Sequence, residues 1–453
     1  MVDYTLLGKE ATELLQKLIR NKCVNEETAE SGNEMRSVET LLEYFKNKKI
    51  LDKVEHEVFK TAENRGNLLL RLKGESVEPS LMYENHMDVV PVNPDNWDVD
   101  PFEAVIKDGW LYGRGTVDML LFTATQAVAF AHLVESGFKP KTDLVFLAVA
   151  DEEGGADYGA RWLVDNVPEK IRATYMIGEF GGAVLQTNKG PKTALMIAEK
   201  GPSWFKMKVT GKSGHASFSY MTDNAIFTAS KILQKIKDNP PPAYFTDAWS
   251  TFVNGLGLSS FSKFMLTNRF TLNTALKQTS KSDLGLAKTL HALTHMTINP
   301  TIINGGLKTN IIPDVVELAF DVRLLPGQDF EYLKNYLESA LGKDLMSKVE
   351  IIPTEVIPGS SDSWDTPLIK SIKKVYGEIE PENEVIPLFL PAVTDSRIFR
   401  KIGIQCYGFS VLTNQVELKD LMAMAHGDNE GIPLEAIELS ARFFYDLALD
   451  FLQ

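Results

Sequence analysis

Residues 144–155 read LVFLAVADEEGG and place an unbroken apolar run directly before three acidic residues. An apolar run of this length is typical of a strand that is covered on both faces of a sheet. The carboxyl ends of strands in an open α/β sheet converge on one crevice. We therefore expect Glu152 and Glu153, which follow the run, at a functional edge of the sheet.

Strand and helix patterns alternate around this stretch. Helices are expected at residues 6–20, 35–47, 119–135 and 159–166, and strands at 67–70, 80–83 and 174–177. This alternation predicts an α/β fold, with a mostly parallel sheet that carries helices on both faces. The pattern returns after residue 357, with helices expected at 368–376 and 434–452 and a strand at 406–409.

A different pattern occupies the middle of the chain. Apolar and charged residues alternate at 205–209 and 316–323, which predicts strands with one exposed face. Amphipathic helices are expected at 226–236 and 330–341. We interpret residues 200–356 as a smaller α+β domain inserted into a larger one, which comprises 1–199 and 357–453. The apolar residues of 239–300 show no clear periodicity, and we interpret this segment as a further insertion that is helical in part.

Length and composition restrict the function classes. A chain of 453 residues is long enough for two domains. The net charge of -14 argues against nucleic acid as a partner, because a phosphate-binding surface needs a basic patch. Two distant cysteines, no secretory leader and no long apolar run predict a cytoplasmic protein without a membrane partner.

Residues that commonly bind metals follow several of the expected strands. They are His86 in YENHMDVV, Asp118 in GRGTVDML, Glu152 and Glu153 in AVADEEGG, Glu179 in YMIGEFGG and His426 in MAHGDNEG. Two imidazoles and three carboxylates would suit two zinc ions. If Glu153 binds metal, Glu152 is free to act as a base. Asp88 lies two residues after His86 and is expected to orient its imidazole.

The chain resembles the di-zinc family of aminoacylases, acetylornithine deacetylases, succinyl-diaminopimelate desuccinylases and glutamate carboxypeptidases. The matching segments are HMDVV, GRGTVDM, DEEGG, IGEFGG, GKSGHAS, NGGLKTNIIPD, FDVRLLPG, AVTDSR and AHGDNEG. They occur in the family's order and span nearly the whole chain. Together these segments are highly specific for the family, whereas any one of them alone would be weak evidence for it.

The resemblance implies a role for each candidate residue. His86 and Glu179 would hold one zinc ion, Glu153 and His426 the other, and Asp118 would bridge them, with cobalt or manganese as substitutes. Glu152 would be the general acid and base, and Asp88 the supporting aspartate. The inserted domain would be a lid and dimerisation domain whose His215 reaches an active site, often that of the partner subunit in a homodimer. Asn310, Arg323 and Arg397 would bind the substrate's carbonyl or free carboxylate.

Some positions depart from the family's pattern. Leu120 replaces a common lysine, Glu179 is aspartate in several relatives, and GHASFSYM lacks the usual proline. The first two changes leave the set of expected metal ligands intact. The third leaves the conformation of the lid loop and the identity of the substrate undetermined. The insertion at 239–300 resembles the longer lids of carboxypeptidase S-like members.

Simpler interpretations compete at single positions. A lone histidine such as His86 is more often structural, and Asp118 alone could cap the following helix. His291 and His295 are four residues apart, like the zinc ligands of one protease class. The glutamate that this class needs is replaced by Ala292, so we interpret both histidines as structural.

These observations lead to a main hypothesis and three alternatives. The main hypothesis is a di-zinc hydrolase that cleaves an amide or peptide bond next to a free carboxylate, as a carboxypeptidase or dipeptidase does. The alternatives are an N-acyl amino acid deacylase, an enzyme that runs the reaction as synthesis, and a binding protein with the same fold. The substrate is expected to be a small peptide or an N-acyl amino acid.

Overall fold

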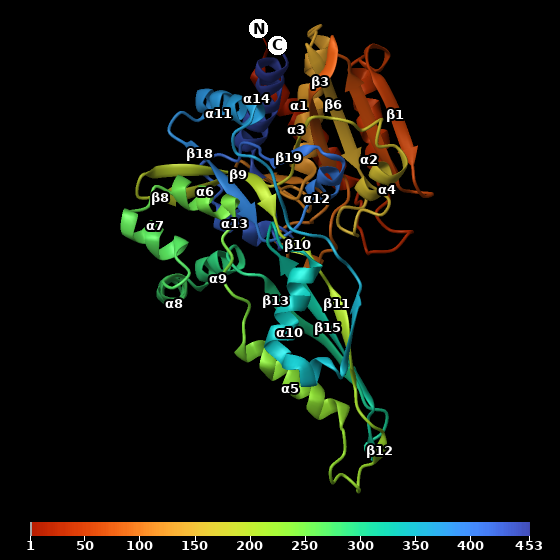
Figure 1. Cartoon of the computed structure of the whole chain (residues 1–453). Helices are drawn as coiled ribbons and strands as arrows, with labels where there is room; N and C mark the ends of the chain where they lie inside the picture. The colour runs from red at the N-terminus through yellow and green to blue at the C-terminus, as the bar shows by residue number, and fades with distance from the viewer. Residues whose placement is uncertain (1) are drawn as a thin grey trace.

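The computed structural model describes residues 2–453 and shows a rounded body with a narrower extension (Figure 1). A ten-stranded sheet forms the centre of the body, and a five-stranded sheet forms the extension. Both chain termini lie on the body, at the end opposite the extension (Figure 1). In residues 2–453, no helix is long and apolar enough to cross a membrane.

Parallel strands form the middle of the large sheet. They are β6 (Thr142–Val149), β3 (Ser76–His86), β7 (Tyr175–Gly178) and β19 (Gln405–Gly408), in this spatial order. The flanking strands are β1 (Glu55–Lys60), β2 (Gly66–Leu72), β8 (Gly181–Thr187), β9 (Gly190–Glu199), β17 (Ser360–Ser361) and β18 (Glu384–Leu390). All of these flanking pairings are antiparallel except β18 with β9. The prediction of a mostly parallel central sheet is confirmed.

Helices cover both faces of this sheet, as the alternating pattern predicts. One face carries α1 (Tyr4–Arg20), α2 (Met35–Asn47), α3 (Leu120–Glu135), α11 (Pro367–Ile379) and α14 (Leu434–Leu452). The other face carries α4 (Ala160–Asn166) and α12 (Ser396–Phe399). Strand β6 is buried along its whole length between these layers. Each large apolar side chain buried here contributes about 1.5–3 kcal/mol, which fixes the strand that leads to Glu152.

The extension has an apolar core of its own. Its sheet contains β10 (Gly201–Pro202), β11 (Phe205–Thr210), β13 (Thr297–Gly305), β15 (Val315–Leu324) and β16 (Val349–Pro353). Helices α5 (Ala225–Asp238) and α10 (Phe330–Met346) contribute apolar residues to the same core. Alternate residues of β15 point into this core, as its sequence pattern predicts. At the far tip, β12 (Gly214–His215) pairs with β14 (Ile311–Ile312).

The segment at 239–300 forms four helices: α6 (Asp247–Gly255), α7 (Ser260–Thr267), α8 (Leu272–Ser282) and α9 (Leu284–Ala292). Apolar residues of α6, α8 and α9, including the fully buried Trp249, join the core of the body. The insertion is therefore helical and packs on the body. The domain boundaries predicted above remain a proposal.

The strands not yet described form a small separate sheet, and one further short helix lies before His426 in the chain. A small sheet contains β4 (Val105–Lys107), β5 (Trp110–Tyr112) and β20 (Gly431–Pro433), and one short helix, α13 (Leu418–Met424), precedes His426. Strand β20 pairs with β5, so the chain around His426 is held near the segment that contains Asp118.

Candidate functional site

Three adjacent parallel strands end at the same edge of the large sheet and bring the predicted residues together. His86 is the last residue of β3, Glu179 follows β7, and Glu152 and Glu153 follow β6. Because β6, β3 and β7 are neighbours, their carboxyl ends open into one crevice.

Asp118 lies between the two predicted histidine ligands. Its Oδ1 is 3.2 Å from His86 Nε2, and its Oδ2 is 3.3 Å from His426 Nε2. Each histidine also faces a glutamate, since Glu179 Oε2 is 3.7 Å from His86 Nε2 and Glu153 Oε2 is 3.1 Å from His426 Nε2. The structure therefore brings all five predicted metal ligands together, as two histidine–glutamate pairs on either side of one aspartate.

Asp88 holds both His86 and the turn that carries the two glutamates. Its backbone oxygen is 3.0 Å from His86 Nδ1, which leaves Nε2 facing Asp118. Its carboxylate accepts hydrogen bonds from the backbone N–H groups of Glu152 and Glu153, at 3.2 and 3.1 Å. Asp88 therefore acts on the imidazole orientation and on the turn at once, as an outer carboxylate around a metal site does.

A buried network beneath this turn was not identified by sequence reasoning. Asn25 Nδ2 donates to Asp88 Oδ2 at 2.8 Å and to Asp151 Oδ1 at 2.9 Å. The fully buried Arg65 pairs with Asp151 and lies 3.5 Å from Glu34. These residues come from separate segments of the first 151 residues, and no local sequence signal connects them.

Glu430 holds the loop that carries Asp118. Its carboxylate accepts hydrogen bonds from the backbone N–H groups of Gly115 and Asp118, at 2.9 and 3.0 Å, and from Arg114 Nη1 at 2.8 Å. Gly115 has a positive φ of 87°, which suits glycine in this turn. Sequence reasoning missed Glu430, although it lies in the AHGDNEG segment four residues after His426.

Glu152 points to a different neighbour from Glu153. Its Oε1 is 3.3 Å from Arg397 Nη1, and its side chain is 11% exposed. Burial raises the pKa of the Glu152 carboxyl, the nearby charges of Asp118 and Asp88 raise it further, and Arg397 and His86 oppose the shift. This carboxyl is therefore poised to hold a proton more readily than an exposed glutamate does.

The electrostatics of the cluster fit a bound cation. Burial and the charge of Asp118 raise the pKa of Glu153 to about 8, and burial raises that of Glu179 well above its usual range. Hydrogen bonds to Asp118 and Glu153 raise the pKa of His426 to about 10. Glu153 Oε1 is buried and has no hydrogen-bond partner among residues 2–453.

A divalent cation would neutralise these carboxylates and use the orphaned oxygen as a ligand. Two overlapping groups, His86–Glu152–Glu179 and His86–Asp118–Glu153, each have donor atoms within 4.8 Å of one another. The donor set of imidazole nitrogen and carboxylate oxygen fits zinc.

The four other predicted residues do not all join this cluster. Arg397 does, through its contact with Glu152. Arg323 lies on β15, where its Nε donates to Asp321 Oδ1 at 2.9 Å and its guanidinium covers the Trp204 ring.

His215 and Asn310 lie at the tip of the extension. The Asn310 backbone oxygen accepts a hydrogen bond from Ala216 N at 3.1 Å. Both residues are exposed, and the tip around β12 is far from the strand ends of the body (Figure 1). Within one chain, His215 and Asn310 therefore do not reach the metal-ligand cluster.

The sequence pattern of peptidase family M20/M25/M40 matches residues 82–450, a range that includes every predicted metal ligand. The chain belongs to this family. The resemblance identified from the motifs is thereby confirmed.

Relatives of this M20 family member carry different names. A probable succinyl-diaminopimelate desuccinylase from Staphylococcus aureus (strain Mu50 / ATCC 700699) is 28% identical over 87% of this chain and 88% of its own length. Aminoacylase-1 from Homo sapiens is 27% identical over 82% of this chain and 80% of its own length.

Among solved structures, the M20 family metallo-carboxypeptidase Sso-CP2 from Sulfolobus solfataricus has the same fold. Its TM-score is 0.70 with 18% identity, and the match covers 100% of this chain and 99% of that one. The family match, together with these relatives, supports hydrolysis of an amide bond by this M20 member.

Proposed function

We propose that this chain is a zinc-dependent hydrolase that cleaves an amide or peptide bond next to a free carboxylate. The observation that carries the proposal is Asp118 between two histidine–glutamate pairs, with Glu152 beside them. His86 and Glu179 would hold one ion, Glu153 and His426 the other, and Asp118 would contact both. When bound, the two ions would make water more acidic and polarise the scissile carbonyl.

Glu152 would move the proton in the reaction. A buried carboxylate whose pKa is raised above that of an exposed glutamate can take a proton from the attacking water. The same carboxyl can then give that proton to the leaving amine. Glu153 is less suited to this task because it faces His426.

Arg397 is the best-placed group to bind a substrate carboxylate. It is buried beside Glu152, and its Nε has no hydrogen-bond partner among residues 2–453. An unpaired guanidinium N–H is costly to bury, and a ligand carboxylate would satisfy it. This supports a substrate whose free carboxylate lies near the scissile bond. Arg323 and Asn310 remain proposed substrate contacts, and Asn310 lies at the tip, away from the cluster of its own chain (Figure 1).

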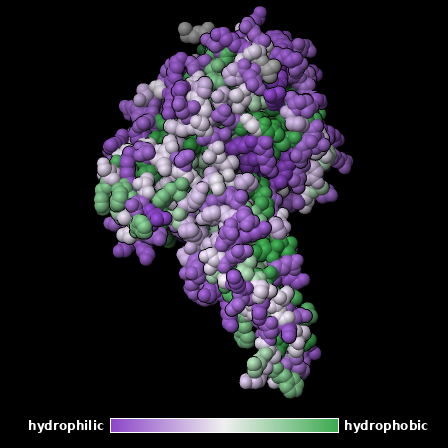
Figure 2. Space-filling model, viewed as in Figure 1, coloured by the Kyte–Doolittle hydropathy of each residue, from purple (hydrophilic) through white to green (hydrophobic). Residues whose placement is uncertain are grey.

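We propose that the enzyme is a homodimer in which His215 serves the partner's site. The exposed tip supports this, because His215 and Asn310 cannot reach the cluster of their own chain. The extension also exposes large apolar side chains, including Phe218, Phe227 and Leu307. Figure 2 shows pale green, hydrophobic atoms at the tip of the extension. Burial of such a surface would favour association.

A substrate panel tests the function and separates a peptidase from a deacylase. Zinc-reconstituted protein is assayed with dipeptides and N-acyl amino acids, each with a free or an amidated carboxyl end. We expect cleavage of the free-carboxylate compounds alone, because amidation removes the charge that Arg397 would bind. Cleavage of dipeptides alone would assign a peptidase, and cleavage of N-acyl amino acids alone would assign a deacylase.

Two results would contradict the proposal. Equal cleavage of free and amidated compounds would exclude recognition of the carboxylate. No cleavage of any compound by protein with two bound metal ions would favour a binding protein with the same fold.

A further inference from the structure

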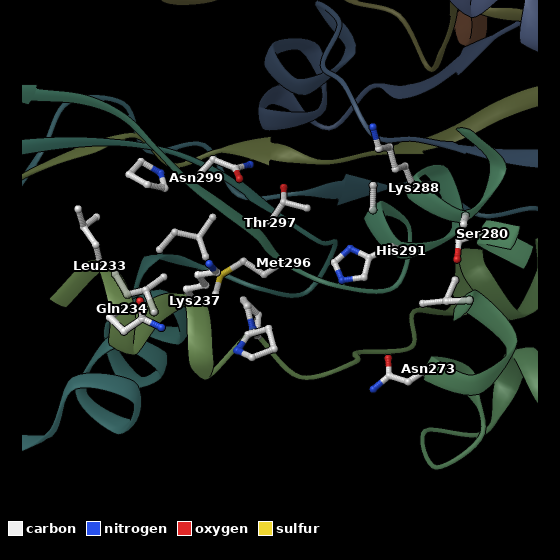
Figure 3. Close-up of a pocket in the computed structure, with 18 of the residues that line it drawn as sticks. Leu233, Gln234, Lys237, Asn273, Ser280, Lys288, His291, Met296, Thr297 and Asn299 are labelled. Atoms are coloured by element: carbon white, nitrogen blue, oxygen red, sulfur yellow. The ribbon is translucent and has the colours of Figure 1, made fainter. Parts of the chain in front are cut away.

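A large groove lies between the extension and the inserted helices, outside the metal-ligand cluster. Its volume is about 1430 Å³, and α5, α8, α9 and β13 supply its walls. Figure 3 shows Leu233 and Lys237 on one side, Asn273 and Ser280 on the other, and Met296 and His291 between them. None of the predicted metal ligands lines the groove.

The floor of the groove is apolar. It is formed by Leu233 on α5, Leu276 on α8, Ala287 on α9, Met296 directly before β13, and Ile298 on β13. Leu276, Ala287 and Met296 are buried from bulk water although they line the groove. An aliphatic chain in contact with this floor would gain about 0.8 kcal/mol for each methylene removed from water.

The charged residues of the groove are all basic. Lys237, Lys277 and Lys288 come from three different helices, and no aspartate or glutamate lines the groove. Within residues 2–453, none of these lysines lies within 4.0 Å of a carboxylate oxygen. All three lysines are exposed, and they give the apolar groove a positively charged rim in a chain whose net charge is -14.

We propose that this groove binds an aliphatic carboxylate, with its chain on the apolar floor and its carboxylate at the lysines. The basic rim supplies charge complementarity for the anion, and the floor supplies the hydrophobic contact. Free fatty acids and N-acyl amino acids share this chemistry, so both can serve as the ligand.

Calorimetric titration of the zinc-loaded full chain with the Glu152→Gln change tests the proposal, because this variant retains the groove but does not consume N-dodecanoylglycine as a substrate. The probes are dodecanoate and N-dodecanoylglycine, and dodecanol and dodecyltrimethylammonium are the comparison compounds. We expect at least one carboxylate to bind at least tenfold more tightly than the neutral and cationic compounds. Tighter binding of dodecanoate would assign a free acid as ligand, and tighter binding of N-dodecanoylglycine would assign an N-acyl amino acid.

Matched variants locate the binding. Ser280→Trp fills the groove, and Lys277→Glu with Lys288→Glu reverses two charges on its rim. We expect each change to weaken carboxylate binding at least tenfold. Ser282→Trp and Lys281→Glu are controls on the same helix, because both residues are exposed and lie outside the groove. The exposed lysines can be changed without disturbing the core, so the test survives if Ser280→Trp does not fold.

Three results would overturn the proposal. The first is no preference for carboxylates over dodecanol and dodecyltrimethylammonium. The second is carboxylate binding that the groove variants leave unchanged but chelation of zinc abolishes, which would locate the ligand at the metals. The third is a fall from dimer to monomer mass by light scattering in Ser280→Trp, with no carboxylate bound to the unchanged chain. That result would make a second copy of the chain the occupant.

Discussion

Glu152, whose buried carboxyl contacts Arg397, is proposed to transfer the proton in the reaction, and this role can be tested by substitution. Glu152→Gln keeps the shape of the side chain but cannot accept a proton. We expect kcat to fall by about 10²- to 10⁴-fold while the chain still binds two metal ions. Turnover numbers and metal analysis of the purified variant measure both effects. Glu338→Gln, at an exposed position on α10, is the matched control. Full activity of Glu152→Gln would exclude Glu152 as the base.

Glu430 carries a prediction about positioning. In Glu430→Gln the amide removes the charge that pairs with Arg114 and turns a donor toward the backbone N–H groups around Asp118. We expect an apoprotein less stable by about 3 kcal/mol, because Arg114 stays buried without its partner. Metal affinity should fall by about 10- to 100-fold. Urea unfolding and chelator competition measure these quantities, and an unchanged metal affinity would show that Glu430 does not position Asp118.

At the scale of elements, a histidine at the end of α9 is expected to make the stability of the fold depend on pH. His295 follows α9 and is buried with the stacked ring of His291 at 4.1 Å, and Lys200 Nζ donates to the His295 backbone oxygen at 2.9 Å. Burial, then the charges of His291 and Lys200, lower the pKa of His295 to about 4. Histidine in the unfolded chain titrates near about 6.5. Between these values the unfolded chain binds more protons, so stability is lost as the pH falls from 6.5 to 4.

His295→Gln should therefore reduce the loss of stability in acid by about 2 kcal/mol. Urea unfolding of the variant and the unchanged chain at pH 7.5, 5.5 and 4.5 measures the difference. His56→Gln, at an exposed position on β1, is the control. Parallel stability curves for His295→Gln and the unchanged chain would show that His295 does not titrate in this range.

The elements also show where sequence patterns are insufficient. The runs that form β9 and β18 are apolar, and a short apolar run does not distinguish a strand from a buried helix. Their assignment depends on pairing, since β18 pairs with β9, which begins almost two hundred residues earlier in the chain. By contrast, β6 is identifiable from its sequence because its apolar run ends directly in the acidic residues.

At the scale of the whole molecule, the metal ions should stabilise the fold. Without cations, the buried carboxylates of Asp118, Glu153 and Glu179 repel one another. Metal at about 100 times its dissociation constant stabilises the native state by about 2.7 kcal/mol. For a chain of this length we expect a chelator to lower Tm by roughly 3 °C. Scanning calorimetry measures the shift in Tm. The chelator should lower the Tm of Asp118→Asn by less, because this variant lacks one of the expected metal ligands. No shift in the unchanged chain would contradict a metal site in the native state.

The distance between His215 and the cluster leads to a prediction about subunits. We expect His215→Gly and Glu152→Gln to be inactive alone and to regain activity when mixed, because a mixed dimer contains one site with both functional residues. Half of the mixed dimers have this composition if subunits exchange freely, which sets a maximum of about one quarter of normal activity. Mixing each variant with itself is the control. No recovery between subunits that do exchange would show that His215 does not act in the partner's site.

The sequence alone determined the alternating pattern, the inserted domain as a hypothesis and the candidate ligand residues, because these depend on local periodicity and on the order of short motifs. The tertiary structure decided which distant residues meet. Asp118 faces His426, Glu430 binds the loop before Asp118, and Arg397 contacts Glu152 across 245 positions of sequence. It also showed that His215 stays at the tip of the extension. These relations depend on how strands pair and helices pack, and no local pattern contains that information.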